Sequence, residues 1–166
     1  MLVIGIDPGT ARTGYGIVRQ VENGSLVAVD FGVIDTGPEL SLPKRLLEIS
    51  NRLGALLAHH RPEEGAMERL FLREHVNTAL SVGQASGVAM LALAAAGIPV
   101  KEYSPLEVKQ AICGYGRADK GQVQQMVKAL LGLSERPRPD DAADALAVAI
   151  CHLHSAPING RLEAEQ

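Results

Sequence analysis

Four carboxylates occur in or beside apolar segments that are expected to be buried, where charged side chains are uncommon. Asp7 ends an apolar run, and Glu68 lies in a segment whose only other charge is the arginine after it. Asp141 and Asp144 are three residues apart, a spacing that puts both side chains on one face of a helix. That face continues through the apolar Val148, so it is expected to point inward. Two neighbouring carboxylates on an inward face repel each other unless a cation lies between them.

Carboxylate oxygens are the ligands that hard divalent cations such as Mg²⁺ and Mn²⁺ prefer. Four of them could bridge two metal ions that activate a water and stabilise the leaving oxygen of a phosphodiester. Ordinary structural roles stay open for two of the acids: Asp7 could be a turn or cap residue, and Glu68 an edge-strand charge facing water. Helix capping explains Asp140, but it does not explain Asp144, which lies past the first turn.

The composition is that of an ordinary globular domain. The 166 residues are 46% hydrophobic and 21% charged, which suffices for one domain with a substantial core. The net charge of −3 gives no global sign of a nucleic-acid partner, although a local basic face matters more than the total. Cys113 and Cys151 fit no metal-ligand pattern and are expected to be free thiols in a reducing compartment. The most apolar run, Val88 to Ile98, is too short to span a bilayer, so we expect no membrane segment and a cytoplasmic location.

The N-terminal part of the chain predicts three antiparallel strands. Residues 2–6 are typical of a strand buried on both faces, and Pro8-Gly9 turns the chain back into a second strand over 13–18. Asn23-Gly24 then predicts a hairpin turn, followed by a third strand over 26–34.

Helices alternate with single strands in the rest of the chain. The patterns predict helices over 44–60, 76–96, 105–113, 119–131 and 140–153, and strands over 65–71 and 100–103. The fold class is therefore α/β, with a mixed five-stranded sheet (three antiparallel strands, then parallel ones) flanked by helices. We predict a single domain over residues 1–155 and a polar C-terminal tail over 156–166.

The segment over 76–96 carries no charge and many small residues. A helix that is apolar nearly all round is buried on more than one side. One side can pack on the sheet, and we expect the other to face a second subunit in a homodimer. The sequence does not resolve which of Ala85, Ala89 and Leu93 points outward.

Five motifs occur in one register along the chain: Gly5-Ile6-Asp7-Pro8-Gly9-Thr10 with Thr13-Gly14-Tyr15-Gly16, Glu68-Arg69-Leu70-Phe71, Gly83-Gln84-Ala85, Val108-Lys109-Gln110 and Asp141-Ala142-Ala143-Asp144-Ala145-Leu146-Ala147. Together they resemble RuvC, the family of bacterial Holliday junction resolvases, from Met1 to about Leu153. The resemblance implies an RNase H-like fold, a homodimer and Mg²⁺-dependent, paired cleavage of four-way DNA junctions in recombination and repair. It also implies the Ruv branch-migration proteins as candidate partners.

Carried over position by position, the resemblance makes Asp7, Glu68, Asp141 and Asp144 the catalytic, metal-binding acids. We expect two Mg²⁺ ions per active site, and Mn²⁺ as a substitute.

Four further residues are expected to contact DNA. The resemblance matches Lys109 and Lys120 to basic residues near the scissile phosphate, and Phe71 to an aromatic that stacks on a base at the crossover. Arg117 joins them because it ends a glycine-containing basic loop that can close on DNA. The ordinary alternatives are a core position for Phe71 and solvated surface positions for the two lysines.

Besides the acidic Glu74, which stands where basic residues are common, the chain departs from the family pattern at two places on the expected DNA face. Family members often read Asp-Pro-Gly-Ser-Arg, whereas Thr10-Ala11-Arg12 places the arginine one residue later. Ser86 stands where a basic residue is common. Neither departure concerns the four acids.

Other classes of function share parts of this pattern. A sugar-kinase or actin-like ATPase lobe also has Asp-x-Gly-Thr after its first strand, but such proteins need two lobes and this chain has one such segment. A non-catalytic RNase H-like interaction module would not need four costly buried acids. Hydrolysis of an RNA–DNA hybrid stays open, although the uncharged helix favours the resolvase, since paired cuts need two active sites on a two-fold dimer.

Overall fold

The computed structural model describes residues 1–69 and 76–163. Its strands are β1 (Leu2–Asp7), β2 (Arg12–Gln20), β3 (Leu26–Asp35), β4 (Glu64–Glu68) and β5 (Val100–Tyr103). Its helices are α1 (Leu42–His60), α2 (Val76–Ala95), α3 (Pro105–Cys113), α4 (Lys120–Leu130) and α5 (Asp140–Glu163).

The five strands form one mixed sheet in the order β3-β2-β1-β4-β5. The central strand β1 pairs antiparallel with β2 and parallel with β4, and β3 continues the antiparallel half through a hairpin at Asn23-Gly24. There Gly24 adopts a positive φ of 83°, which a glycine reaches without strain, and the Asn23 side chain accepts a hydrogen bond from the Ser25 amide. The predicted α/β, RNase H-like sheet with three antiparallel strands followed by parallel ones is confirmed.

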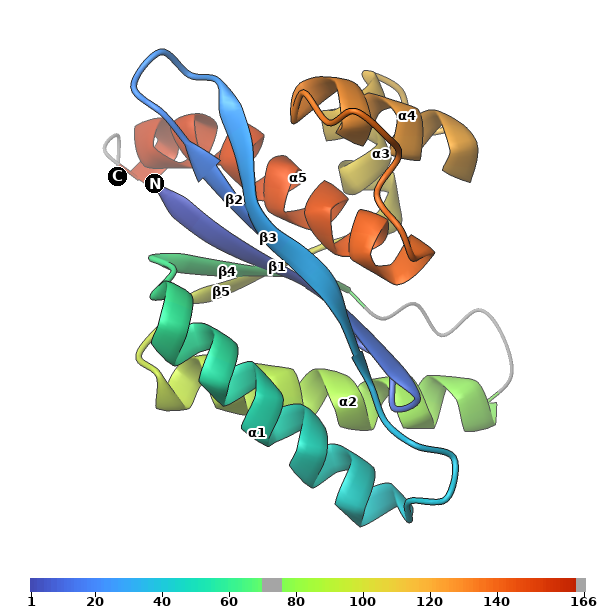
Figure 1. The fold of residues 1–166 in the computed structure, drawn as a ribbon. Coiled ribbons are helices and arrows are strands. Elements are labelled where there is room, and N and C mark those ends of the chain that lie inside the picture. Colours follow the sequence, from blue (N-terminus) through green and yellow to red (C-terminus); the bar gives the residue numbers. More distant parts are fainter. Residues whose placement is uncertain (70–75, 164–166) are drawn as a thin grey trace.

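Helices cover both faces of this sheet (Figure 1). Helices α1 and α2 cover one face, against Ile4 and Ile6 of β1. Helix α5 lies across the other face, with α3 and α4 outside it, and contacts Val3 of β1. The alternation along β1 therefore directs Val3, Gly5 and Asp7 toward α5.

Glycines allow α5 to lie directly on the sheet. A Cβ atom at Gly5 would overlap the carbonyl oxygen of Ala145, and one at Gly14 would overlap the carbonyl oxygen of Asp141. Gly14 is also the strand partner of Asp7. The close approach thus brings the start of α5 over the end of β1.

Gly14→Ala should destabilise the protein by about 1–3 kcal/mol, because the added methyl group meets backbone that cannot rotate away. We expect a lower urea midpoint of unfolding, together with reduced nuclease activity as α5 moves off β1. Gly54→Ala is the matched control: its added methyl group meets nothing within 4 Å, and alanine is the better helix former by up to about 1 kcal/mol. A Gly14→Ala variant as stable as the wild type would contradict the close-packing argument.

Two sequence-based expectations change. The helix predicted to end at Leu153 continues through Pro157 to Glu163 as α5. Proline lacks the amide donor of one helical hydrogen bond, but a helix can continue through it. Residues 70 and 71 of the predicted fourth strand lie outside the described residues, and β4 itself ends at Glu68. The division into a domain over 1–155 and a tail over 156–166 stays a prediction.

None of the three residues considered for the outward side of α2 lies on that side. Ala85, Ala89 and Leu93 are all fully buried against the sheet. The outward side carries Leu80 and Leu91, whose exposed fractions are 63% and 66%. Sequence could not separate the sides because both are apolar.

Candidate active site

The first two acids end neighbouring parallel strands. Asp7 closes β1 and Glu68 closes β4, and the preceding residues, Ile6 and Met67, are paired in register. Ala66, two residues before Glu68, is buried in the cluster on the α5 side of the sheet. Both carboxylates therefore project toward α5 from the same edge of the sheet.

The other two acids come from the first turns of α5. Asp141 lies over Gly14, the strand partner of Asp7. Asp144 is one turn further along and lines a hollow together with Glu68. The inward face predicted from the three-residue spacing is confirmed. The fold thus brings together four acids that are far apart in the sequence.

Burial and mutual repulsion change the acidity of these groups. The pKa of Asp7 is raised to about 7, first by burial and then by the charges of Asp144, Glu68 and Asp141. Burial and the charge of Asp144 likewise raise the pKa of Glu68. The pKa of Asp144 is raised by burial, an effect that the hydrogen bond from Lys120 partly offsets. Such a cluster binds protons until a cation replaces them.

These shifts predict a pH-dependent stability for the metal-free protein. Because the folded-state pKa of Asp7 lies above its ordinary value of 3.8, the folded state holds an extra proton between about pH 4 and pH 7. Stability should therefore fall as pH rises through this window, by on the order of 1.4 kcal/mol per pH unit at most. Asp7→Asn should flatten this dependence in urea unfolding with EDTA present. Glu22→Gln, in the exposed β2–β3 hairpin, should not alter it; an equally steep curve for Asp7→Asn would contradict the assignment.

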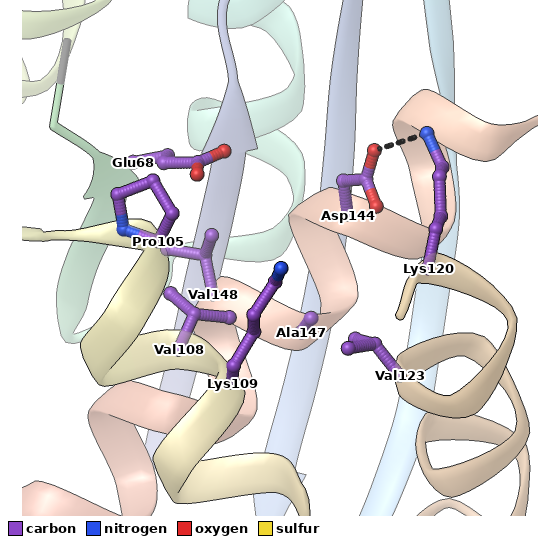
Figure 2. Close-up of a pocket in the computed structure, with 9 residues that line it drawn as sticks. All are labelled: Glu68, Pro105, Val108, Lys109, Lys120, Val123, Asp144, Ala147 and Val148. Atoms are coloured by element: carbon purple, nitrogen blue, oxygen red, sulfur yellow. Dashed lines mark hydrogen bonds and ion pairs between the residues drawn. The ribbon is translucent and has the colours of Figure 1, made fainter. Parts of the chain in front are cut away.

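Two lysines face the acids across a hollow of about 250 Å³ (Figure 2). Lys109, from α3, directs its ammonium group into the space between Glu68 and Asp144. Lys120, the first residue of α4, contacts Asp144 at 2.9 Å and Asp140 at 3.3 Å. Both lysines that were expected to contact DNA therefore lie beside the acids; Lys120 is 55% exposed and pairs with two carboxylates.

The donor set fits a hard divalent cation, since it consists of carboxylates that repel one another. In their present rotamers, however, no three His, Cys, Asp or Glu side chains of the described residues are placed to hold a metal ion together. Two of the acids are paired with cations instead: Lys120 contacts Asp144 at 2.9 Å, and Arg12 lies 3.6 Å from Asp141. The residue types therefore suit a metal, while in this structure two of the carboxylates have cationic partners.

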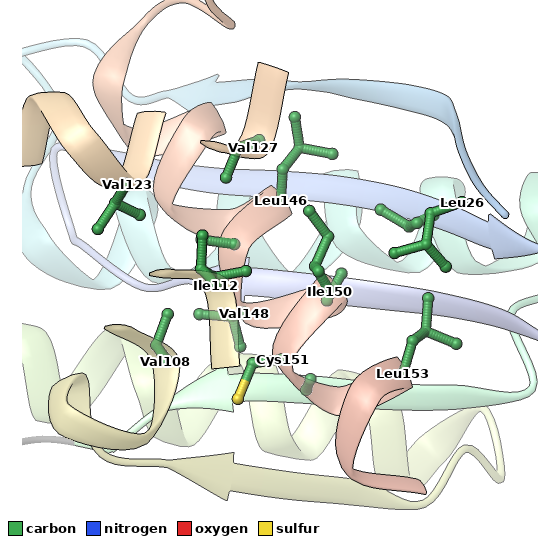
Figure 3. Close-up of a cluster of buried hydrophobic side chains, with 14 of the residues drawn as sticks. Leu26, Val108, Ile112, Val123, Val127, Leu146, Val148, Ile150, Cys151 and Leu153 are labelled. Atoms are coloured by element: carbon green, nitrogen blue, oxygen red, sulfur yellow. The ribbon is translucent and has the colours of Figure 1, made fainter. Parts of the chain in front are cut away.

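Packing fixes α5 over the sheet. Leu146 and Ile150 are buried against the sheet and the outer helices, with Ile112 of α3 and Val127 of α4 in the same cluster (Figure 3). Close-packed buried side chains leave little freedom for the helix that carries two of the acids.

A hydrogen-bonded chain ties α5 to the sheet two turns beyond Asp144. His152 is 4% exposed; its Nε2 is hydrogen-bonded to the carboxylate of Glu64 of β4 at 2.6 Å, and its Nδ1 to the hydroxyl of Tyr103 in β5 at 2.9 Å. Buried polar groups satisfied in this way specify one packing arrangement. The position of α5 along the sheet is thus fixed at two points.

The two remaining residues that the sequence suggested for DNA contact, Arg117 and Phe71, have different outcomes. Arg117 is exposed in the loop before α4, outside the residues that line the hollow of Figure 2. Phe71 lies outside the described residues, so its role stays a prediction.

Sequence reasoning missed the contact of Arg12 with Asp141 and the close-packing glycines. Glycines recurring at alternate positions of β2 were the available signal, because they mark one strand face that another backbone approaches.

Comparisons with known proteins agree with this arrangement. The family model "Crossover junction endodeoxyribonuclease RuvC" matches residues 3–152. A relative of that name from Chloroflexus aurantiacus is 57% identical over 157 residues, covering 95% of each chain.

Two solved structures superpose on nearly the whole chain. The Thermus thermophilus RuvC structure has a TM-score of 0.89 at 38% identity and covers 96% of this chain and 97% of that one. The same organism's RuvC in complex with a Holliday junction substrate has a TM-score of 0.87 at 36% identity, with 95% and 96% covered. A family match over most of the length, together with the convergence of the four acids, leads to one conclusion: this chain belongs to the crossover junction endodeoxyribonuclease RuvC family.

Proposed function

We propose that this protein is an endodeoxyribonuclease that resolves four-way (Holliday) DNA junctions by paired, symmetric hydrolysis of phosphodiester bonds. The observation that carries the proposal is the convergence of four acids at the ends of β1 and β4 and the start of α5. Beside them lies a hollow lined by Glu68, Asp144 and the two lysines, in a chain whose relatives are crossover junction endodeoxyribonucleases. A related RuvC has been solved with a Holliday junction substrate. Family membership disfavours an ATPase lobe.

Asp7, Glu68, Asp141 and Asp144 are assigned as the catalytic acids that hold Mg²⁺, two ions per site, with Mn²⁺ as a substitute. Bound metal would supply an activated water and stabilisation of the leaving oxygen. Asp7 takes the central place, because the charges of the other three acids all act on its carboxylate. Asp7 ends the central strand of the sheet, so strand pairing on both sides holds its backbone in place.

Lys109 and Lys120 are assigned to phosphate groups near the cut, and Arg117 and Phe71 to further DNA contacts. The two lysines present ammonium groups beside the acids, where a scissile phosphate must lie. Their charges lower the pKa of Glu68, against the larger effect of burial, so they also favour the ionised form that binds metal.

Lys120→Ala should weaken junction binding and flatten its salt dependence. Each phosphate contact adds about 0.9 to the log–log slope of affinity against salt for duplex DNA, so losing one should reduce the slope by about that amount. Fluorescence anisotropy in EDTA at several salt concentrations measures it without cleavage. Lys44→Ala, at the exposed start of α1 on the opposite face of the sheet, is the control. An unchanged slope for Lys120→Ala would mean that Lys120 contacts no phosphate and serves only as the ion-pair partner of Asp144.

We further propose that the protein acts as a homodimer through the outward side of α2. Leu80 and Leu91 are exposed on that side, and an apolar surface of this kind is rarely left in water. Gly87 between them is open to approach, since a Cβ there would meet nothing within 4 Å. A two-fold dimer would provide the two active sites that paired cuts need.

Partners and location follow from the family rather than from the site. We expect the Ruv branch-migration proteins as partners and the cytoplasm as the place of action. In the described part of the chain, no helix combines the length and apolar character needed to cross a membrane. Cys113 and Cys151 are free cysteines, as predicted.

The decisive experiment offers the protein a synthetic four-way junction, a linear duplex and an RNA–DNA hybrid of matched sequence, each with Mg²⁺. We expect paired nicks in the junction and little cleavage of the other two. Preferential cleavage of the hybrid would favour the hybrid-hydrolase alternative, and no cleavage of any substrate would contradict the proposal.

A further inference from the structure

A second hollow of about 720 Å³ lies at the start of α5. Its lining is Arg12, Lys120, Arg138, Pro139, Asp140 and Asp141. Lys120 lines both hollows, so the two are neighbours around that side chain. The lining contains three cations and two carboxylates, and two further carboxylates, Asp35 and Asp144, pair with Arg12 and Lys120.

Arg12 reaches this hollow from the first residue of β2 and is shared between two carboxylates. Its Nε donates to Asp35 Oδ1 at 2.7 Å, and its Nη1 lies 3.6 Å from Asp141 Oδ2. The first distance is that of a charge-assisted hydrogen bond, whereas the second is too long for one. The contact with Asp141 is therefore a loose ion pair, which another anion can replace while Asp35 keeps the side chain in place.

Arg138 approaches the hollow from the segment that precedes α5. It stands between Pro137, which is buried, and Pro139, which lines the hollow. Prolines on both sides restrict the backbone that carries the arginine. Its charge acts on Asp140, whose pKa is lowered by Gln124, Lys120 and, to a smaller extent, Arg138. Arg138 is thus an exposed guanidinium held on a stiff segment at the edge of the active site.

We propose that Arg12, Lys120 and Arg138 form a binding site for one backbone phosphate of the DNA strand, next to the scissile phosphate, and that this phosphate replaces Asp141 as the partner of Arg12. Guanidinium groups suit the planar, two-oxygen face of a phosphate. This inference rests on the proposed function.

The exchange links DNA binding to metal binding. Asp141 is one of the assigned metal ligands, and Arg12 competes for its charge while no DNA is present. A phosphate that takes Arg12 frees Asp141, so DNA and metal should each strengthen the binding of the other. Arg12 and Arg138 are positioning residues in this scheme, and neither performs the chemical step.

The first test measures junction affinity against salt in EDTA for Arg12→Ala, Arg138→Ala and the double variant. We expect each single variant to reduce the log–log slope by about 0.9. Arg19→Ala is the matched control, an exposed arginine near the opposite end of the same strand as Arg12. Asp35→Asn removes the strand-to-strand pair but keeps the guanidinium, and should retain the wild-type slope. A double variant with the wild-type slope would overturn the phosphate site.

The second test measures Mn²⁺ binding to the DNA-free protein by calorimetry. Arg12→Ala should bind Mn²⁺ at least about fivefold more tightly, because Asp141 loses a competing cation. Arg138→Ala, which lacks this contact, should bind Mn²⁺ as the wild type does. Unchanged Mn²⁺ affinity for Arg12→Ala would overturn the exchange. If wild-type protein binds and cuts junctions while the slopes stay unchanged, only the further inference fails; if wild-type protein neither binds nor cuts them, the proposed function fails.

Discussion

Asp7→Asn should reduce junction cleavage in Mg²⁺ by at least about 100-fold, since even residues that only support metal ligands cost 10–100-fold when changed. Junction affinity measured in EDTA should stay within about twofold, because cations elsewhere neutralise the phosphates. The variant keeps the size of the side chain and removes the charge that the other three acids surround. Single-turnover cleavage and anisotropy binding, measured on the same junction, separate the two effects.

The same outcome is expected for Glu68→Gln, Asp141→Asn and Asp144→Asn. Asp119→Asn is the matched control: Asp119 caps α4 beside Lys120, and asparagine caps helices as well as aspartate does. It should cut normally. Any one of the four acid variants that cuts at the wild-type rate in Mg²⁺ would lose its assigned role.

Leu91→Glu should separate the homodimer. Leu91 is 66% exposed in the single chain, and a charge placed at the centre of a two-fold apolar interface is buried twice without a partner. We expect the dissociation constant of the dimer to rise at least about 100-fold. We also expect the two incisions of one junction to become independent. Sedimentation equilibrium at micromolar concentration measures the first effect, and product analysis on a circular junction measures the second.

Leu106→Glu is the control for this prediction. Leu106 is also an exposed leucine, 59% accessible, but it lies on α3 at the opposite face of the sheet. Its variant should remain dimeric. Ala89→Glu is unsuitable as a test, because Ala89 is fully buried against the sheet and a charge there would unfold the chain rather than separate subunits. A monomeric wild-type protein at micromolar concentration would rule out the dimer through α2.

The sequence by itself determined the local elements and the identity of the acids. Strand and helix patterns depend on neighbours within a few residues, which is why the hairpin at Asn23-Gly24 and the helix over 105–113 could be predicted. Asp144 was recognisable as a functional candidate because a second carboxylate on an inward helix face has no local explanation.

Only the tertiary structure decided which surfaces meet. The side of α2 that faces the core depends on what covers it, so Ala85 and Leu91 were equivalent until the sheet was in place. The pKa of Asp7 near 7 results first from its burial and then from three acids in two distant segments. The contact of Arg12 with Asp141 requires α5 to lie over β2. Such contacts depend on pairs of residues far apart in the chain, and electrostatic effects between them vary with distance and burial, which no local pattern records.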